Sequence, residues 1–316
     1  MTMERIGYDS LYKRALGTAR QRAQFLQAFD PQTAGLLRLD TIEPRGTELF
    51  DVLPAWYRRV ADIVAQVEAD EVGRELVLIH VEVQRTKQQH FGQRMLDYYT
   101  LLRRSTGLPV LPYAVLLYPG RPALGYKTYE ERFRGRTVAS LTYFQVSLPS
   151  LHARQYAASG NALARALAST MRLPHLEEER QGIYRAAIAA ILGALGREEM
   201  DDDAAAALWA LVHTYLPYRI ERPDEVDVEW NEEDATMVQK LDQKWLADIR
   251  AQGQAEGQLE GALRAKRAWL KEDIARRFGA VSPEVAARID GVDSEDQLDA
   301  IKSRLDTATA PDQLFT

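Results

Sequence analysis

Residues 56–84, WYRRVADIVAQVEADEVGRELVLIHVEVQ, contain two apolar runs around a polar stretch at 68–74. This pattern predicts a β-hairpin. If Val72 is the centre of the turn, Asp62 faces Glu82 across the two strands. Side chains alternate between the two faces of a strand. The odd-numbered residues are apolar throughout and predict the core face: Ala61, Ile63, Ala65, Val67, Val77, Ile79, Val81 and Val83.

The even-numbered face gathers its polar residues at one end of the hairpin: Asp62, His80, Glu82 and Gln84. Two carboxylates directly opposite each other destabilise a sheet. Such a pair is tolerated if a cation lies between the oxygens, and Mg²⁺ takes one or two carboxylates with water and phosphate oxygens. It is equally tolerated if the face is a solvated polar patch. A register slip of one residue would separate the carboxylates, so their pairing is a hypothesis.

Several motifs carry a resemblance to a known family. Asp62 followed by Glu82-Val83-Gln84 resembles the D…ExQ variant of the PD-(D/E)XK nuclease core. More narrowly, the chain resembles the Rpn family of recombination-promoting nucleases, also described as putative transposases. The matching segments, in order, are YDSLYK (8–13), FLQAF (25–29), RRVADIV (58–64), LIHVEVQ (78–84) and FGQRMLDYY (91–99). Gln84 departs from the wider superfamily, in which lysine is usual at this position.

The resemblance implies an α/β fold, with a restriction-endonuclease-like mixed sheet flanked by helices, that cleaves DNA with Mg²⁺ or Mn²⁺. It implies Asp62, Glu82 and Gln84 as catalytic residues. Asp62, Glu82 and the backbone carbonyl of Val83 would bind the metal, and Asp9 would add an acidic group. A simple N-cap at the first helix is the alternative for Asp9. The competing function is a catalytically weak or inactive adaptor that binds DNA and oligomerises.

Four basic residues are candidate contacts to DNA phosphates: Arg94, Lys13, Arg132 and Arg134. Arg94 lies on a helix predicted over 87–104, and its guanidinium can bind phosphate through two donors. The alternative for Arg94 is a surface ion pair with Asp97. Arg132 and Arg134 lie among aromatic residues in the segment 119–136, a composition that suits single-stranded nucleic acid. A solvated loop is the favoured alternative for that segment.

Composition restricts the remaining choices. The chain has 316 residues and no cysteine, which excludes disulfides and thiolate zinc sites. The N-terminal residues lack the apolar region of a signal peptide, and no apolar run is long enough to span a bilayer, so a cytoplasmic protein with no membrane partner is expected. The net charge of −6 is uneven, because residues 1–150 carry 20 basic and 16 acidic residues while residues 151–316 carry 20 and 30. This asymmetry permits phosphate binding in the first half.

Three domains are predicted: a nuclease-like domain at 1–150, a helical domain at 151–251, and a glycine-repeat helix with a small helical domain at 252–316, which resembles a domain often appended to Rpn-type proteins. Further strands are expected at 36–43, 109–118 and 137–148. A helix is expected over 9–29, with Gly17 as a possible break, and another over 232–251. Gly253, Gly257 and Gly261 recur every fourth residue. On a helix they would form a smooth line, which predicts a homo-oligomer through residues 252–269, flanked by Leu259 and Leu263. In a coil they would form a flexible linker.

Overall fold

The computed structural model describes residues 8–45, 61–69, 75–219, 221, 231–279, 281–292, 295–305, 308 and 310–315. These residues form two compact units, the first reaching Leu246 and the second beginning at Ala247. Across the described ranges, no helix has the length and apolar character needed to cross a membrane.

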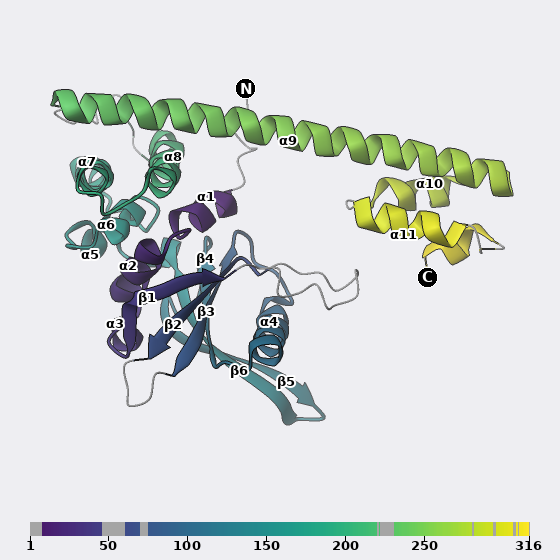
Figure 1. Cartoon of the computed structure of the whole chain (residues 1–316), viewed down its shortest axis with the longest axis horizontal. Coiled ribbons are helices and arrows are strands. Elements are labelled where there is room, and N and C mark those ends of the chain that lie inside the picture. The colour runs from purple at the N-terminus through teal and green to yellow at the C-terminus, as the bar shows by residue number, and fades with distance from the viewer. Residues whose placement is uncertain are drawn as a thin grey trace. The chain divides into compact units, whose positions relative to one another are not determined.

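The first unit is built on a six-stranded mixed sheet in the order β1-β2-β3-β4-β6-β5 (Figure 1). Neighbouring strands are antiparallel except β3–β4 and β4–β6, which are parallel. Helix α4 (Phe91–Thr106) connects the parallel strands β3 and β4. The strands span Leu37–Arg45, Ile63–Ala69, Leu76–Gln84, Val110–Leu116, Leu124–Phe133 and Arg136–Ser147 in chain order. The predicted α/β class, with a mixed sheet flanked by helices and a helical C-terminal part, is confirmed.

The hairpin register agrees with the prediction. Val64 pairs with His80, and Ile63 pairs with Val81. Strand β2 continues to Ala69, so it enters the stretch predicted as turn. The proposed centre of the turn, Val72, lies outside the described residues. Every odd-numbered residue predicted as core is buried, so the parity argument was correct.

Helices cover both faces of this hairpin. Helices α1 (Tyr8–Ala15) and α2 (Ala19–Phe29) contribute to the hydrophobic core on the odd-numbered face, and the short α3 (Pro31–Ala34) follows. Helix α4 lies over the other face, where Phe91 and Met95 pack with residues of β4 and β6. The predicted break between α1 and α2 falls at Gly17, where a β-carbon would lie 2.9 Å from the Arg14 carbonyl oxygen.

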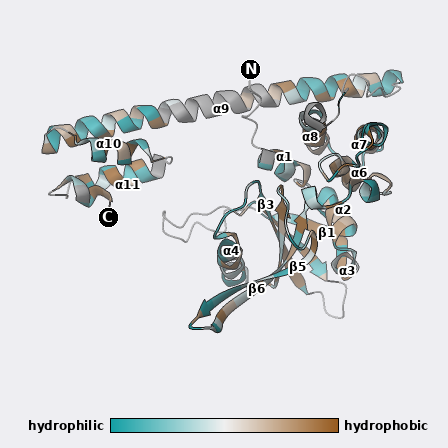
Figure 2. Cartoon of the chain, turned by 180° about the vertical axis from the view of Figure 1, so that it is seen from behind, coloured by the Kyte–Doolittle hydropathy of each residue, from teal (hydrophilic) through white to brown (hydrophobic). Residues whose placement is uncertain are grey.

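The segment between β4 and β6 differs from the prediction. The favoured interpretation, a solvated loop, is wrong, because Leu124–Phe133 forms β5, the edge strand, and pairs with β6 in a hairpin. Figure 2 shows that the end of this hairpin is hydrophilic, and most β5 side chains are exposed. A strand is recognised in a sequence by alternating apolar and polar residues, and a strand without an apolar face lacks this alternation.

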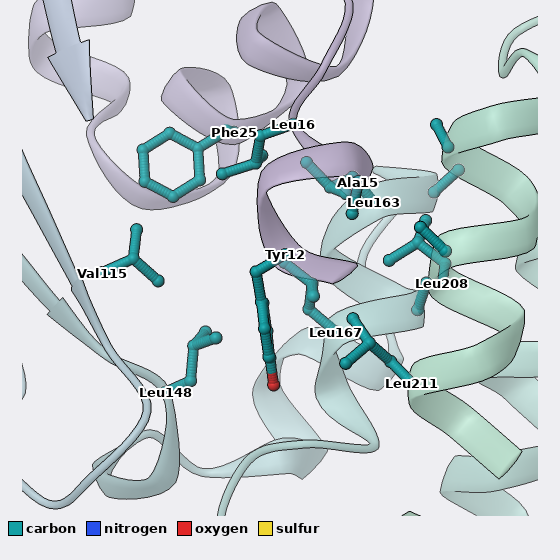
Figure 3. Packing of buried hydrophobic residues seen from close by; sticks show 14 of the residues in the cluster. Tyr12, Ala15, Leu16, Phe25, Val115, Leu148, Leu163, Leu167, Leu208 and Leu211 are labelled. Carbon is teal, nitrogen blue, oxygen red and sulfur yellow. The ribbon is translucent and has the colours of Figure 1, made fainter. Parts of the chain in front are cut away.

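Helices after the sheet join the same hydrophobic core, which therefore crosses the predicted boundary at residue 150. They are α5 (Ala153–Ala157), α6 (Ala162–Ala168), α7 (Glu177–Gly196) and α8 (Asp202–Arg219), after a short 3₁₀ turn at Leu148–Ser150. Figure 3 shows the Tyr12 ring of α1 between Leu148 on the sheet side and Leu167 and Leu211 on the helical side. Helix α1 is thus the layer between the sheet and α8.

The second unit has its own core. This core is formed by residues of the later part of α9 (Glu232–Phe278), of α10 (Pro283–Asp290), of α11 (Glu295–Leu305) and of a 3₁₀ turn at Pro311–Phe315. Helix α9 is longer than the predicted 232–251 and includes the glycine repeat, so the coil alternative is wrong. Leu263 is buried among residues of α10 and α11, and is therefore not the exposed flank that was predicted for self-association.

Candidate active site at the end of the β2–β3 hairpin

The two carboxylates predicted to face each other are brought together by the hairpin. Asp62 precedes the first residue of β2, and Glu82 lies near the end of β3. The Asp62 backbone N–H donates to Glu82 Oε1 at 3.1 Å, and the Val83 backbone N–H donates to Asp62 Oδ2 at 2.8 Å. These two bonds continue the strand pairing through side chains, so the carboxylates are fixed relative to the backbone.

Lys13 joins this pair from helix α1. Its Nζ lies 2.7 Å from Asp62 Oδ1 and 3.6 Å from an oxygen of Asp9, one turn earlier on the same helix. Asp9 therefore lies in the first turn of α1 and contacts the site only through Lys13. The cation between the carboxylates of Asp9 and Asp62 is an ammonium of the protein itself.

Burial and neighbouring charge act on both members of the Lys13–Asp62 pair. Burial raises the pKa of Asp62, and the charge of Glu82 raises it further, although hydrogen bonds from Lys13 and Val83 oppose the rise. For Lys13, burial favours the neutral amine, but the hydrogen bond to Asp62 and the charges of Asp62, Asp9 and Glu82 raise its pKa above its ordinary value. Keeping Asp62 ionised in this buried position therefore costs free energy, and a nearby cation offsets that cost.

His80 forms the buried side of the site. It is fully buried on the face covered by α4, with Nε2 3.1 Å from Glu82 Oε1 and its ring edge-on to Tyr98 at 5.4 Å. Because a carboxylate only accepts, Nε2 carries the donated proton. Glu82 itself is 3 % exposed, so the alternative of a solvated polar patch is wrong at this residue.

Gln84 and Arg94 form the third part of the site. Arg94, on α4, donates to Gln84 Oε1 and to Gln88 Oε1, so the helix lies along the end of β3 as predicted. Gln84 Nε2 donates to the Thr86 carbonyl oxygen at 2.7 Å. Both ends of the Gln84 amide are therefore engaged, and the side chain is held in one orientation.

The donor set suits a hard divalent cation. Within the described ranges, no group of three or more His, Cys, Asp or Glu side chains is arranged around a metal position. Asp62 and Glu82 would instead bind the ion with the Val83 carbonyl, and water or phosphate oxygens would complete the shell. Val83 lies beyond Ile63–Val81, the last β2–β3 backbone pair, and its N–H points toward Asp62. In a strand the C=O of a residue points to the same side as its N–H, so the Val83 carbonyl also faces the side of Asp62.

Arg132 and Arg134 do not join the site. They lie at the far end of the β5–β6 hairpin, and β5 is separated from β3 by β6 and β4. Arg132 pairs with Glu130, and Arg134 adopts a positive φ of 47° at the turn, with its guanidinium over the Phe133 ring. Their predicted contact with DNA phosphates stays a prediction, and it would be made away from the carboxylates.

Two residues of the site were not predicted to have their observed roles. His80 was expected only to pack on the mixed face, and Gln88 was not among the candidate residues. The signal for His80 was its parity, because it shares a strand face with Glu82 two residues away. For Gln88, which precedes α4, the pattern of the sequence offered no signal, because its contact depends on how the chain turns after β3.

Comparisons with known proteins identify no relative. No family model matches the chain, no curated protein matches it, and no solved structure matches it.

Proposed function

We propose that this chain is a metal-dependent nuclease that hydrolyses phosphodiester bonds of DNA. The observation that carries the proposal is the pair of carboxylates, Asp62 and Glu82, fixed at one end of the hairpin with Gln84 and Arg94 beside them. This is the arrangement that the resemblance to PD-(D/E)XK nucleases, and to the Rpn family within them, implies. A mixed sheet in which a hairpin leads into a parallel crossover agrees with such a core.

Each residue has a separate role in this proposal. Bound Mg²⁺ or Mn²⁺ would supply an activated water and offset charge on the phosphate. Asp62, Glu82 and the Val83 carbonyl would hold the ion, and His80 keeps the Glu82 carboxylate oriented by its hydrogen bond to Oε1. Gln84 would position the water or a phosphate oxygen, with its amide fixed by Arg94 and Thr86. Lys13, which is paired with Asp62, would contact a phosphate oxygen of the bound strand.

Cleavage of a supercoiled plasmid tests this proposal. Wild type is expected to cleave with Mg²⁺ or Mn²⁺ and to stop when EDTA is added. Asp62→Ala and Glu82→Ala are each expected to lower the rate by at least about 100-fold, since each removes a ligand of an ion that contributes several kcal/mol to the transition state. Asp40→Ala is the matched control, because it removes an exposed carboxylate of β1 and should cleave at the wild-type rate.

The fold of each variant is checked by circular dichroism and thermal unfolding. Cleavage by Asp62→Ala and Glu82→Ala at the wild-type rate would show that the site is assigned wrongly. A wild-type chain that is folded and cleaves nothing with either metal ion would favour the adaptor described next.

A non-catalytic adaptor is the second candidate, and one observation favours it. Asp62 and Gln84 are already satisfied internally, because Lys13 neutralises Asp62 and both ends of the Gln84 amide are bound within the protein. An adaptor of this kind would bind DNA and self-associate without cleaving it. The same plasmid assay separates the two candidates, since an adaptor shifts the mobility of DNA without producing nicked or linear product.

A further inference from the structure

A cavity lies beside the candidate active site, and the residues that line it differ in chemical character from those of the site. It has a volume of about 310 Å³ and is enclosed by the segment before α4, the start of α4, the end of β4, and strands β5 and β6. Gln88, which accepts a hydrogen bond from Arg94, is part of its wall, and Arg94 also holds Gln84. Pockets for small ligands start at about 300 Å³, so the cavity has room for one small planar group.

The strand register places this cavity relative to the carboxylates. Glu82 pairs with Ala114, and Ala114 pairs with Gln145, which lines the cavity. Neighbouring strands lie about 4.8 Å apart, so Gln145 is about 10 Å from Glu82 on the same face of the sheet. Ala114, which lies between them, is fully buried against α4, so a strand whose phosphate lies at Glu82 would reach the cavity around the start of α4.

The lining combines aromatic rings with positive charge. It includes the aromatic side chains of Phe91, Tyr118, Tyr129 and Tyr143, and the basic side chains of Lys87, Arg121 and Lys127. None of the described residues that line it is acidic. Burial raises the pKa of Tyr143 to about 12, so this ring stays neutral under ordinary conditions. Aromatic rings that stack with bases, beside cations that contact phosphates, are the elements by which proteins hold single-stranded nucleic acid.

Gln145 adds an unsatisfied acceptor to this lining. Its side chain is fully buried, and its Nε2 donates to the Pro122 carbonyl oxygen. Because a carbonyl only accepts, this bond determines which end of the amide is nitrogen. The other end, Oε1, is buried and receives no hydrogen bond in the described structure. Buried acceptors without a donor are uncommon, and Gln145 is one of the residues that line the cavity, so a ligand with an N–H group would supply the missing donor.

We propose that this cavity binds one unpaired nucleobase of the nucleic-acid strand that crosses the carboxylates. The base would stack against the tyrosine rings and donate an N–H to Gln145 Oε1, while Lys87, Arg121 and Lys127 contact adjoining phosphates. The chain would thus favour DNA in which one base lies outside the helix over fully paired duplex. This inference rests on the proposed function for the position of the strand, and binding of the base itself requires no cleavage.

The test is a binding measurement in EDTA, where metal-dependent cleavage cannot occur. Three fluorescent duplexes are compared by anisotropy: one fully paired, one with a single extra unpaired base, and one with an abasic residue in place of that base. Stacking of one base on an aromatic ring corresponds to at least several-fold in affinity. Wild type is therefore expected to bind the unpaired-base duplex about 10-fold more tightly than the abasic one.

Variants of β5 separate the role of the cavity from that of the fold. Tyr129→Ala is expected to abolish the preference for the unpaired base, whereas Tyr129→Phe, which keeps the ring, retains it. Tyr126→Ala is the matched control, because Tyr126 lies on the same strand but contacts Phe144 and Thr33 instead of the cavity. A wild-type chain with no preference, or an equal loss in Tyr126→Ala and Tyr129→Ala, would overturn the proposal.

Two further measurements complete the test. The first asks whether the cavity binds free nucleotides or a base of a strand, and the second asks whether the preference depends on cleavage. Nucleoside monophosphates are added as competitors. If they bind at micromolar concentration while the unpaired-base duplex shows no advantage, the pocket holds free nucleotides and the strand proposal is wrong. Asp62→Ala is assayed as well. Because Asp62→Ala should not cleave, it is expected to keep the preference. A wild-type chain that shows the preference but cleaves nothing with Mg²⁺ or Mn²⁺ supports the pocket and counts against the nuclease, while Mg²⁺-dependent cleavage without any preference does the reverse.

Discussion

Asp62 lies at the centre of the candidate site, and its environment acts on the pKa of its carboxyl in two directions. Burial and the charge of Glu82 favour the protonated carboxyl, whereas Lys13 and the Val83 N–H favour the carboxylate. The first pair of effects is larger, because the pKa is raised above its ordinary value of 3.8. The native state therefore binds this proton more tightly than the unfolded chain does.

The raised pKa predicts how stability depends on pH. The stabilisation from Asp62 is fully present below its unfolded pKa of 3.8 and is lost as the pH rises through the higher folded-state pKa. The free energy of unfolding of wild type minus that of Asp62→Asn is therefore expected to fall between acidic and neutral pH. Urea unfolding in EDTA measures it at each pH.

The control for this measurement is Asp40→Asn, which removes an exposed carboxylate, and its difference from wild type should change far less with pH. A difference for Asp62→Asn that instead grows toward neutral pH would mean that the ion pair with Lys13 outweighs burial.

Much of the site could be predicted at the scale of residues, because parity along a strand assigns Asp62, Glu82 and Gln84 to one face. The exclusion of water from Glu82 could not be predicted, since it depends on α4 and on the ring of His80. The contact between Lys13 and Asp62 joins residues far apart in the chain, and no local pattern reports it. The separation of Arg132 and Arg134 from the carboxylates could not be predicted, because composition carries no information about distance.

At the scale of elements, the approach of α4 to β5 depends on a glycine. A β-carbon on Gly92 would lie 2.5 Å from Cδ2 of Tyr129 and 3.0 Å from its Cβ, so the strand or the helix would have to shift. The Tyr129 ring is thereby placed against the start of α4. Because Tyr129 and Gly92 both line the base-sized cavity, the same contact shapes its wall.

Gly92→Ala is expected to destabilise the protein by about 1–3 kcal/mol, the usual cost of forcing extra atoms into a packed site. Gly182→Ala, on α7, is the matched control, since no atom lies within 4 Å of the added β-carbon. It should stabilise by up to about 1 kcal/mol through helix propensity. Thermal unfolding of the two variants measures both changes, and a stabilised Gly92→Ala would show that Tyr129 moves freely.

Prediction of the elements themselves succeeded where burial produces a pattern. The central strands and α4 have apolar residues at the spacing of their secondary structure. Strand β5 was missed because nearly all of its side chains are exposed, and its identity comes from pairing with β6. The length of α9 was missed because three glycines suggested an interruption, whereas helical structure continues through them.

At the scale of the whole molecule, the predicted homo-oligomer stays a prediction. Gly253, Gly257 and Gly261 lie on α9, where a four-residue spacing places them on one face. The full chain is expected to sediment as a dimer at micromolar concentration, and a chain ending at Arg250 as a monomer. Leu263 is buried in the hydrophobic core of the second unit, so Leu263→Ala should lower the stability of that unit. Identical sedimentation of the full and shortened chains as monomers would exclude this interface.

The position of α1 between the sheet and α8 has a consequence during protein synthesis. Lys13, on one side of α1, contacts Asp62, while Tyr12 packs against Leu211 of α8 and Arg14 lies 3.9 Å from Asp203. Helix α1 is therefore completed by a helix that is made much later in translation, and contacts between such distant segments form slowly. While translation is still short of α8, the nascent chain lacks the support that holds Lys13 against the carboxylates. The proposed site would therefore be complete only after translation has passed α8, and a chain shorter than that would lack the proposed activity.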